Sequence, residues 1–176
     1  MSTQREHGPF RNLEALRDRV HNHSQRVLLE HAAHFACRLG CSDCCQTERT
    51  VTDVEFDALV RAVDALAPET RARLSAQEGP TPCPLLLDGG CAVYDERPLI
   101  CRSHGLPLVM EGQHDVCPLN FTDLSILTLP DHDLLSVDTL TAVLVAVNAL
   151  YCEEEGGDPH RRRPVHELFT PREGSK

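Results

Sequence analysis

Four cysteines lie within nine residues of one another, at Cys37, Cys41, Cys44 and Cys45. The residues between them are mostly small or polar, so the backbone can bend and direct several sulfurs toward one point. Thiolates this close repel one another unless a cation or a disulfide takes up their charge. Four more cysteines follow in the block from Cys83 to Cys117. We therefore expect the rest of the fold to bring these two blocks together.

The cysteine pattern favours metal binding over a disulfide framework. The N-terminus is polar and lacks the apolar segment of a signal peptide, which predicts a cytoplasmic protein. In that compartment, clustered cysteines are more often metal ligands or catalytic residues than disulfides. An odd total of 9 cysteines and the adjacent Cys44-Cys45 pair also fit disulfides poorly.

Charge and hydropathy narrow the classes of partner. The chain has 17 basic and 27 acidic residues, a net charge of −10, which argues against a nucleic-acid partner. It has no run of about 18 apolar residues, so we expect no membrane span. Aromatic residues make up 4% and tryptophan is absent. The expected partner is a metal ion or cluster that supplies part of the stability of the core. A protein partner is a further possibility, and the sequence does not identify one.

Helical signals cover much of the chain. Apolar spacing predicts a helix from Pro9 or Phe10 toward Phe35, with a weak step at residues 22–24. A capping box starts a second helix, from Thr52 to near Leu66, and Pro68 starts a shorter one over residues 68–77. A last helix is predicted from Ser136 or Val137 to Tyr151.

The segment from Cys83 to Tyr94 predicts a β-hairpin, with two apolar runs around Asp88-Gly89-Gly90. A two-residue turn would put positions 83 and 91 on opposite faces. A three-residue loop would put them on one face but about 13 Å apart. Prolines on both sides of Cys83 place it in a loop before the strand, which relaxes this limit.

These elements predict a compact, mainly α-helical α+β domain with a small β-hairpin and a cysteine-rich metal site. We expect a disordered N-terminus over residues 1–8, a single cysteine-cluster domain over residues 9–152, and a charged C-terminal tail over residues 153–176. One anchored turn is expected within that tail, at Val165–Phe169.

Cys101 is predicted to project from a short helical turn that starts at Pro98 and ends at Gly105. Arg97 and Arg102 flank it, and cations balance the charge of thiolates. We assign both arginines to cofactor support, with ordinary surface ion pairing as the alternative. His34 is a further possible ligand because it lies on the helix face that leads into the cysteines.

Eight cysteines are the predicted metal ligands, and Cys152 at the end of the last helix is expected to be a buried or unligated thiol. Eight thiolates are enough for two tetrahedral zinc sites, or for an iron–sulfur cluster with further cysteines in support. Adjacent cysteines normally point apart, so two of them would reach neighbouring centres. The predicted ligands are Cys37, Cys41, Cys44, Cys45, Cys83, Cys91, Cys101 and Cys117.

The first three cysteines have the spacing C-x₃-C-x₂-C, which resembles the cluster loop of radical S-adenosylmethionine enzymes. The length and helix order do not supply the α/β barrel of those enzymes. In the second block the cysteines are separated by 8, 10 and 16 positions, so tertiary structure has to assemble the site.

Taken together, the two blocks resemble the YkgJ-type cysteine-cluster family, a zinc- or iron-chelating domain labelled C-x-x-C-x-x-C-C. The shared motifs are Cys-x₃-Cys-x₂-Cys-Cys, then Cys83-Pro84-Leu85-Leu86, then Gly90-Cys91-x-x-Tyr94-x-x-Arg97-Pro98-x-x-Cys101-Arg102. The resemblance covers residues 35–120, and the first gap has three residues where the family label has two.

The resemblance implies metal or iron–sulfur binding. Two Cys-Pro steps and the clustered thiols favour an iron–sulfur cluster over zinc. One alternative is a structural zinc module that presents a surface to a protein partner. Another is a cluster-dependent enzyme related to flagellin lysine N-methylase, which carries a similar cysteine pattern. No catalytic residue is identified from the sequence.

Overall fold

The computed structural model describes residues 8–38, 40–77 and 79–170. The predicted disorder of residues 1–8 therefore lies, apart from Gly8, outside the described residues. Contacts divide the chain into two compact units, each built from two separate stretches. The first unit comprises residues 1–38 and 99–156, and the second comprises residues 39–98 and 157–176. The fold class is mainly helical α+β, as the sequence predicts.

The first unit is built on the long helix α1, Arg11–Glu30. Its buried face contains the predicted apolar positions Leu13, Leu16, Val20 and Val27. The helix runs unbroken through residues 22–24, where the sequence suggested a weak point. It ends at Glu30, before the predicted limit, and the 3₁₀ turn η1, Ala32–His34, follows it.

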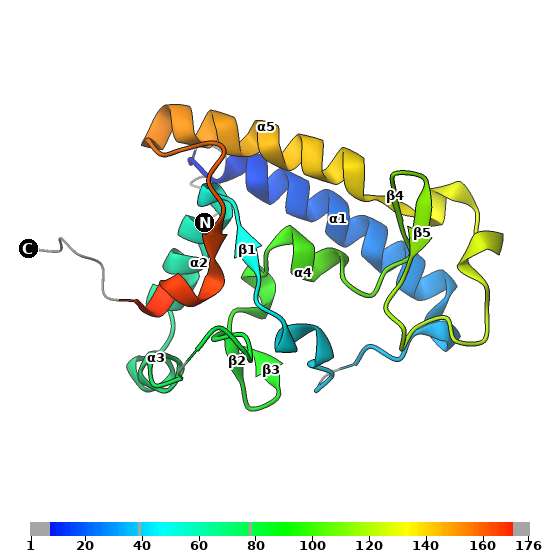
Figure 1. Cartoon of the computed structure of the whole chain (residues 1–176), viewed down its shortest axis with the longest axis horizontal. Coiled ribbons are helices and arrows are strands. Elements are labelled where there is room, and N and C mark those ends of the chain that lie inside the picture. Colours follow the sequence, from blue (N-terminus) through cyan, green and yellow to red (C-terminus); the bar gives the residue numbers. More distant parts are fainter. Residues whose placement is uncertain (1–7, 39, 78, 171–176) are drawn as a thin grey trace, which may run out of the picture. The chain divides into compact units, whose positions relative to one another are not determined.

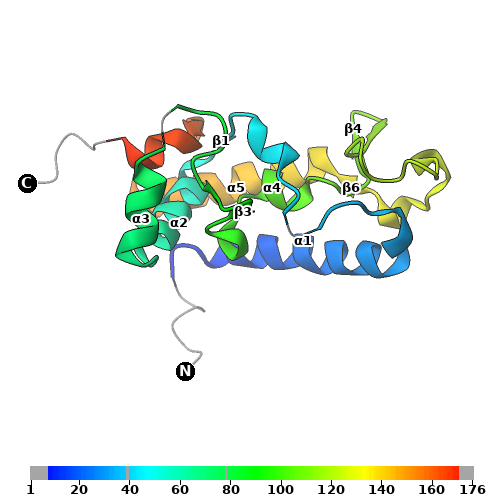
Figure 2. The ribbon, with the colours of Figure 1, turned by 90° about the horizontal axis from the view of Figure 1, so that it is seen from below.

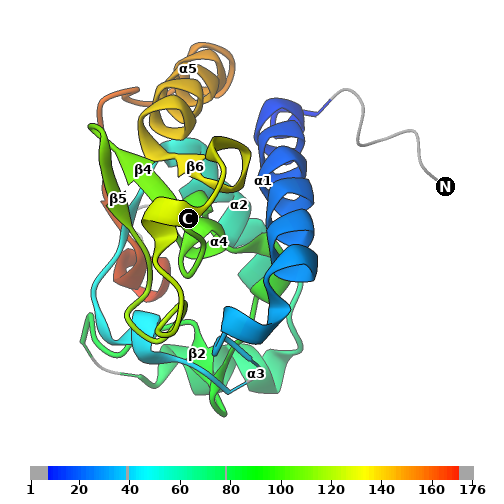
Figure 3. The same cartoon turned by 90° about the vertical axis from the view of Figure 1, so that its right-hand side faces the viewer.

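Two further helices contact α1, namely α5, Val137–Glu155, and the short α4, Leu99–Ser103 (Figures 1 and 3). The Ser136 hydroxyl caps α5 by accepting a hydrogen bond from the Thr139 N–H at 3.2 Å, as helix starts commonly require. The predicted helical turn after Pro98 is α4, and Gly105 follows it at φ +95°. The α5 helix continues four residues past its predicted end at Tyr151.

A three-stranded sheet of order β5-β4-β6 completes the first unit and contacts α5 through β4 (Figure 3). Strand β4, Leu108–Met110, pairs antiparallel with β5, Gln113–Asp115, and parallel with β6, Leu135–Ser136. An apolar run predicts a strand over Leu106–Met110 and a turn at Glu111-Gly112-Gln113. The structure has β4 within that run, but Gln113 already begins β5, which the sequence does not predict. All of β5 is polar and exposed, so it carries no alternating pattern. Two 3₁₀ turns, η4, Ile126–Thr128, and η5, Asp131–Asp133, connect β5 to β6.

The second unit contains α2, Asp53–Asp64, and α3, Pro68–Ser75. The predicted capping box is present, because the Thr52 N–H donates to Glu55 Oε2 at 3.2 Å. Val51 and Phe56 are fully buried in the same apolar cluster, as a hydrophobic staple requires. The other buried members of this cluster are Leu59, Val63, Leu85, Val93 and Val165.

Residues near the C-terminus pack onto this core. Strand β7, Arg163–Pro164, pairs antiparallel with β1, Thr50–Val51. The 3₁₀ turn η6, Val165–Phe169, then lies against α2 (Figures 1 and 2). Its bounds are those of the turn that the sequence places within the charged tail.

Candidate metal centre

Cys44 and Cys45 lie on the 3₁₀ turn η2, Asp43–Gln46. The turn is closed by the Cys45 N–H, which donates to the Ser42 carbonyl at 2.8 Å. Arg49 donates from Nη2 to the Cys44 carbonyl at 3.1 Å, so a guanidinium is anchored beside the adjacent cysteines. Both thiols are half-buried, and Cys41, just before the turn, is exposed.

A backbone hydrogen bond joins the two cysteine blocks within the second unit. The Cys83 N–H donates to the Cys45 carbonyl at 2.7 Å. Cys83 lies in a loop, as its flanking prolines predict, and the Leu86 N–H closes a turn onto the Cys83 carbonyl at 2.9 Å. This turn reverses the chain between Cys83 and the strand.

The predicted hairpin consists of β2, Leu86–Leu87, and β3, Gly90–Cys91, with Leu86 opposite Cys91. Its two-residue turn has positive φ at Asp88 and Gly89, 51° and 80°, which is the type I′ geometry of tight hairpins. In regular strands this turn would separate positions 83 and 91 onto opposite faces. The loop at Cys83 removes that restriction, and both cysteines pack against the apolar core of the second unit.

Electrostatic effects link four of these thiols. Burial, together with repulsion by Cys45 and Cys41, raises the pKa of Cys44 to about 11. Burial is also the largest cause of the raised pKa values of Cys45, Cys83 and Cys91. Neighbouring thiols add to the increase at each of the four sites. The thiolate forms therefore need a cation nearby, which is the role a bound metal fills.

Two arginines partly offset this repulsion. Arg49 lowers the pKa values of Cys44, Cys45 and Cys83, and Arg97 lowers that of Cys91. The Arg97 guanidinium also stacks 3.4 Å from the Tyr94 ring centroid. The sequence identified Arg97 but missed Arg49, because no spacing rule connects Arg49 with a cysteine. The other predicted arginine, Arg102, lies on α4 in the first unit, next to Cys101.

The first unit carries Cys37, Cys101 and Cys117. Cys101 lies on α4 and is half-buried, as is Cys117, whereas Cys37 is exposed. Cys152 is 8% exposed on α5, as expected for a buried thiol. His34 lies on η1, where its Nδ1 is 2.8 Å from Asp123 Oδ1. The structure thus places five predicted ligands in the second unit and three in the first.

The donor set fits zinc, iron or an iron–sulfur cluster. Thiolates are soft ligands that select these metals over calcium or magnesium. Each of the nine cysteines is a thiol in the structure. Burial of the four interacting sulfurs disfavours their bare thiolates, so a bound metal cation would have to neutralise most of their charge. The nearby guanidinium groups would balance the negative charge that remains.

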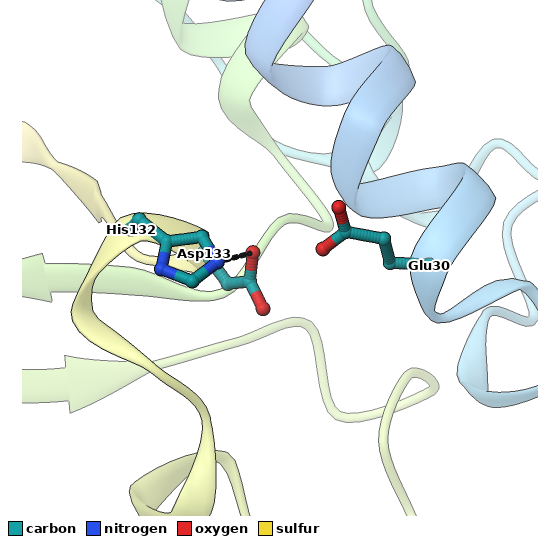
Figure 4. Close-up of side chains that lie close together, drawn as sticks. All are labelled: Glu30, His132 and Asp133. Atoms are coloured by element: carbon teal, nitrogen blue, oxygen red, sulfur yellow. Dashed lines mark ion pairs between the residues drawn. The ribbon is translucent and has the colours of Figure 1, made fainter.

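A second group of possible ligands lies at the end of α1 (Figure 4). Among the described residues, Glu30, His132 and Asp133 are the only three whose ligating atoms all lie within 4.8 Å of one another. The Arg26 guanidinium hydrogen-bonds both Glu30 and Asp133. Because this internal cation already holds the two carboxylates, we interpret the group as a structural charge network.

Comparison with known families agrees with the donor chemistry. Residues 36–118 match the family model described as "CxxCxxCC: Putative zinc- or iron-chelating domain". This matched segment, the cysteine-cluster segment, covers just under half of the chain. The cysteine-cluster segment contains all eight predicted ligands and excludes Cys152. The match supports metal binding by this segment, of the zinc- or iron-chelating type.

No curated protein and no solved structure matched the chain. None of the helices in the described part of the chain is long and apolar enough to cross a membrane.

Proposed function

We propose that the cysteine-cluster domain holds an iron–sulfur cluster. The observation that carries this proposal is the spacing of the thiols in the second unit. Cys44, Cys45, Cys83 and Cys91 are close enough to raise one another's pKa values. Within the described residues, however, no three cysteine sulfurs lie within 4.8 Å of one another.

This spacing is wider than a single zinc ion requires. Tetrahedral zinc has Zn–S distances of about 2.3 Å, which separates its sulfurs by only about 3.8 Å. In a 4Fe–4S cluster each of the four cysteines binds a different iron, and in a 2Fe–2S cluster they are shared between two irons. In both cases the thiolates are spread over a larger inorganic core than a single zinc ion. The four thiols of the second unit would hold the cluster. Arg49 and Arg97 would balance its charge, and Arg102 would do the same for a metal bound at Cys101 in the first unit.

Such a cluster would supply one-electron redox chemistry, with a potential set by nearby hydrogen bonds and charge. The protein residues determine which irons are exposed and how much positive charge surrounds the core. Reduced thiols persist in the cytoplasm, and we infer that location for the protein.

A structural zinc site is the second candidate. It is supported by the packing of Cys83 and Cys91 against the apolar core around Phe56 and Leu59. A metal bound there would directly stabilise a small core, which is the usual role of a closed four-cysteine zinc site. In this version the metal fixes a surface for a protein partner and takes no part in chemistry.

Anaerobic purification followed by metal analysis and visible spectroscopy tests these proposals. The iron–sulfur version predicts iron and acid-labile sulfide in the purified protein, with a visible absorption that bleaches on reduction. Stoichiometric zinc in a colourless protein would replace it with the zinc version. A protein with no bound metal and quantitative disulfides would contradict both.

A further inference from the structure

Asn120 is a buried polar residue that lies two positions beyond the end of the family match, with 2% of its surface exposed. Its N–H donates to the Cys117 carbonyl at 2.8 Å and closes a turn over residues 117–120. Pro118 occupies the second position of this turn, where its fixed φ is favourable. The turn directs the Asn120 side chain toward other segments of the first unit, near the predicted ligands Cys37 and Cys101.

The Asn120 side chain uses every hydrogen-bonding position that an amide has. Its Oδ1 accepts from the Ala36 N–H at 2.9 Å and the Cys37 N–H at 3.3 Å. Its Nδ2 donates to the Gly105 carbonyl at 2.8 Å and to Cys37 Sγ at 3.3 Å. If the amide were flipped, Nδ2 would face the Ala36 and Cys37 N–H donors, and Oδ1 would face the Gly105 carbonyl oxygen. The orientation that points an N–H at the sulfur is therefore the only satisfied one.

Gly105 leaves room for this arrangement. It has φ +95°, and a Cβ added there would lie 3.1 Å from Cys37 Sγ and 3.2 Å from Asn120 Nδ2. Any larger residue would crowd the sulfur and its donor at the same time. Gly105 also follows α4, the helix that carries Cys101. One amide thus ties together the backbone segments that carry Cys37, Cys101 and Cys117.

We propose that Asn120 is a positioning residue for a metal-binding Cys37. The inference rests on the proposed function, to which it adds Cys37 as a further metal ligand in the first unit. The two bonds to Oδ1 fix the backbone of residues 36 and 37, and the N–H···S bond orients the sulfur and disperses its negative charge. Outer-shell donors of this kind are known to change metal affinity by about 10–100-fold when they are removed.

Asn120→Asp is the most informative variant because it keeps the shape and the Oδ1 acceptor but replaces the N–H donor with a second oxygen. We expect zinc binding by the metal-free protein, measured by competition with a chromophoric chelator, to weaken about 10–100-fold. The metal content of the protein as purified should fall as well. Asn22→Asp, on the exposed surface of α1, makes the same chemical change and should leave both values unaltered.

A double-mutant cycle separates positioning of Cys37 from a general structural role. Cys37→Ser alone should lower the affinity for the metal ion that this thiol binds. Adding Asn120→Asp to Cys37→Ser should cause little further loss, because the sulfur on which Asn120 acts is gone. An equal loss of affinity with and without Cys37 would contradict the proposal.

Nuclear magnetic resonance of the wild-type protein provides a test that needs no folded Asn120 variant. The Asn120 side-chain N–H resonances should shift when cadmium is added, and Cys37→Ser should abolish that shift. Asn120 side-chain resonances that do not shift when cadmium binds would contradict the inference.

These measurements distinguish failure of the proposed function from failure of the inference about Asn120. A wild-type protein that takes up neither zinc, cadmium nor iron would contradict the proposed function itself. A wild-type protein that binds metal while Asn120→Asp keeps its full affinity would contradict only the role of Asn120. Unchanged binding in Cys37→Ser would likewise remove the inference and leave the thiols of the second unit as the site.

Discussion

Asp133 shows how a single buried carboxylate organises the first unit. It is 1% exposed, and its Oδ2 lies 2.8 Å from His31 Nε2 while Arg26 binds its Oδ1. Burial alone would raise its pKa, but the bonds from His31 and Arg26 outweigh burial and hold the pKa below its ordinary value. Burial and the nearby Arg26 charge also lower the pKa of His23. The carboxylate thus connects α1 to the 3₁₀ turn η5.

We expect Asp133→Asn to lower the free energy of unfolding at pH 7 by about 2–4 kcal/mol, a value between those of exposed and fully buried ion pairs. Because the pKa of Asp133 is lowered in the folded state, its contribution is complete above the unfolded pKa of about 3.9. It is lost as the pH falls through the lower folded pKa. We therefore expect the difference in unfolding free energy between wild type and Asp133→Asn, measured by urea unfolding, to become smaller from pH 7 to pH 3.

Asp123→Asn is the matched control, since the Asp123 pKa is also lowered by a histidine, His34, but 65% of its side chain is exposed. It should have a clearly smaller effect at pH 7. A pH-independent difference between wild type and Asp133→Asn would show that the charge of Asp133 contributes little.

The thiols differ in what their removal should do. Cys91→Ser removes a predicted ligand that also packs on the core of the second unit, so we expect insoluble or metal-depleted protein. Cys152→Ser changes a buried thiol on α5 outside the family match and should cost only about 1 kcal/mol, with unchanged metal content. Metal per chain, measured for the two variants side by side, tests the ligand assignment. Loss of metal only in Cys152→Ser would reverse it.

At the scale of elements, α2 is the helix most fully specified by local sequence. The Thr52 hydroxyl and N–H both donate to Glu55 Oε2, at 3.0 Å and 3.2 Å, and all of these groups are buried. The chain before α2 carries the adjacent cysteines, and η6 packs on the helix itself. The start of α2 therefore follows the cysteine turn within a few residues.

We expect Thr52→Ala to lower the free energy of unfolding by about 1 kcal/mol, the usual cost of losing a helix cap. The effect should appear in thermal or urea unfolding of the metal-loaded protein. Thr141→Ala, at an exposed position of α5 beyond its first turn, makes the same side-chain change away from a helix start. It should cost less or even stabilise, because alanine is the better helix former. Equal costs for the two substitutions would argue against the capping box.

At the scale of the whole molecule, we expect the two units to depend differently on metal. The first unit has a helical core on α1 and α5, with Leu13, Val20 and Val147 buried. The second has a small apolar cluster against which two predicted ligands pack. Binding of a structural metal can supply about 10 kcal/mol in small peptides. This is comparable to the total stability of a typical domain, about 5–15 kcal/mol.

Metal removal should therefore loosen the second unit first. We expect amide hydrogens of α2 and of the β2–β3 hairpin to lose protection from exchange after chelation, while those of α1 and α5 keep most of theirs. Hydrogen exchange followed by mass spectrometry measures both groups in one experiment. Uniform loss across the chain would mean that the metal stabilises the molecule as one cooperative body.

The sequence by itself determined the elements whose signals are local. The Thr52–Glu55 capping box, Pro68 at a helix start and the Asp88-Gly89 turn each act within a few residues, and the structure has each of them. The apolar spacing predicted α1 equally well, but the helix ends at Glu30, before the predicted limit near Phe35. The cysteine motifs were sufficient to predict the family that residues 36–118 match.

Only the tertiary structure decided how the site is assembled. The bond from the Cys83 N–H to the Cys45 carbonyl, the approach of Arg49 to the thiols, and the contact of Asn120 with Cys37 join segments that no periodic pattern relates. The pairing of β7 with β1 is of the same kind, because each strand is only two residues long. Short strands and loop hydrogen bonds form only when packing brings their partners together. Their energies depend on burial, which a local pattern does not encode.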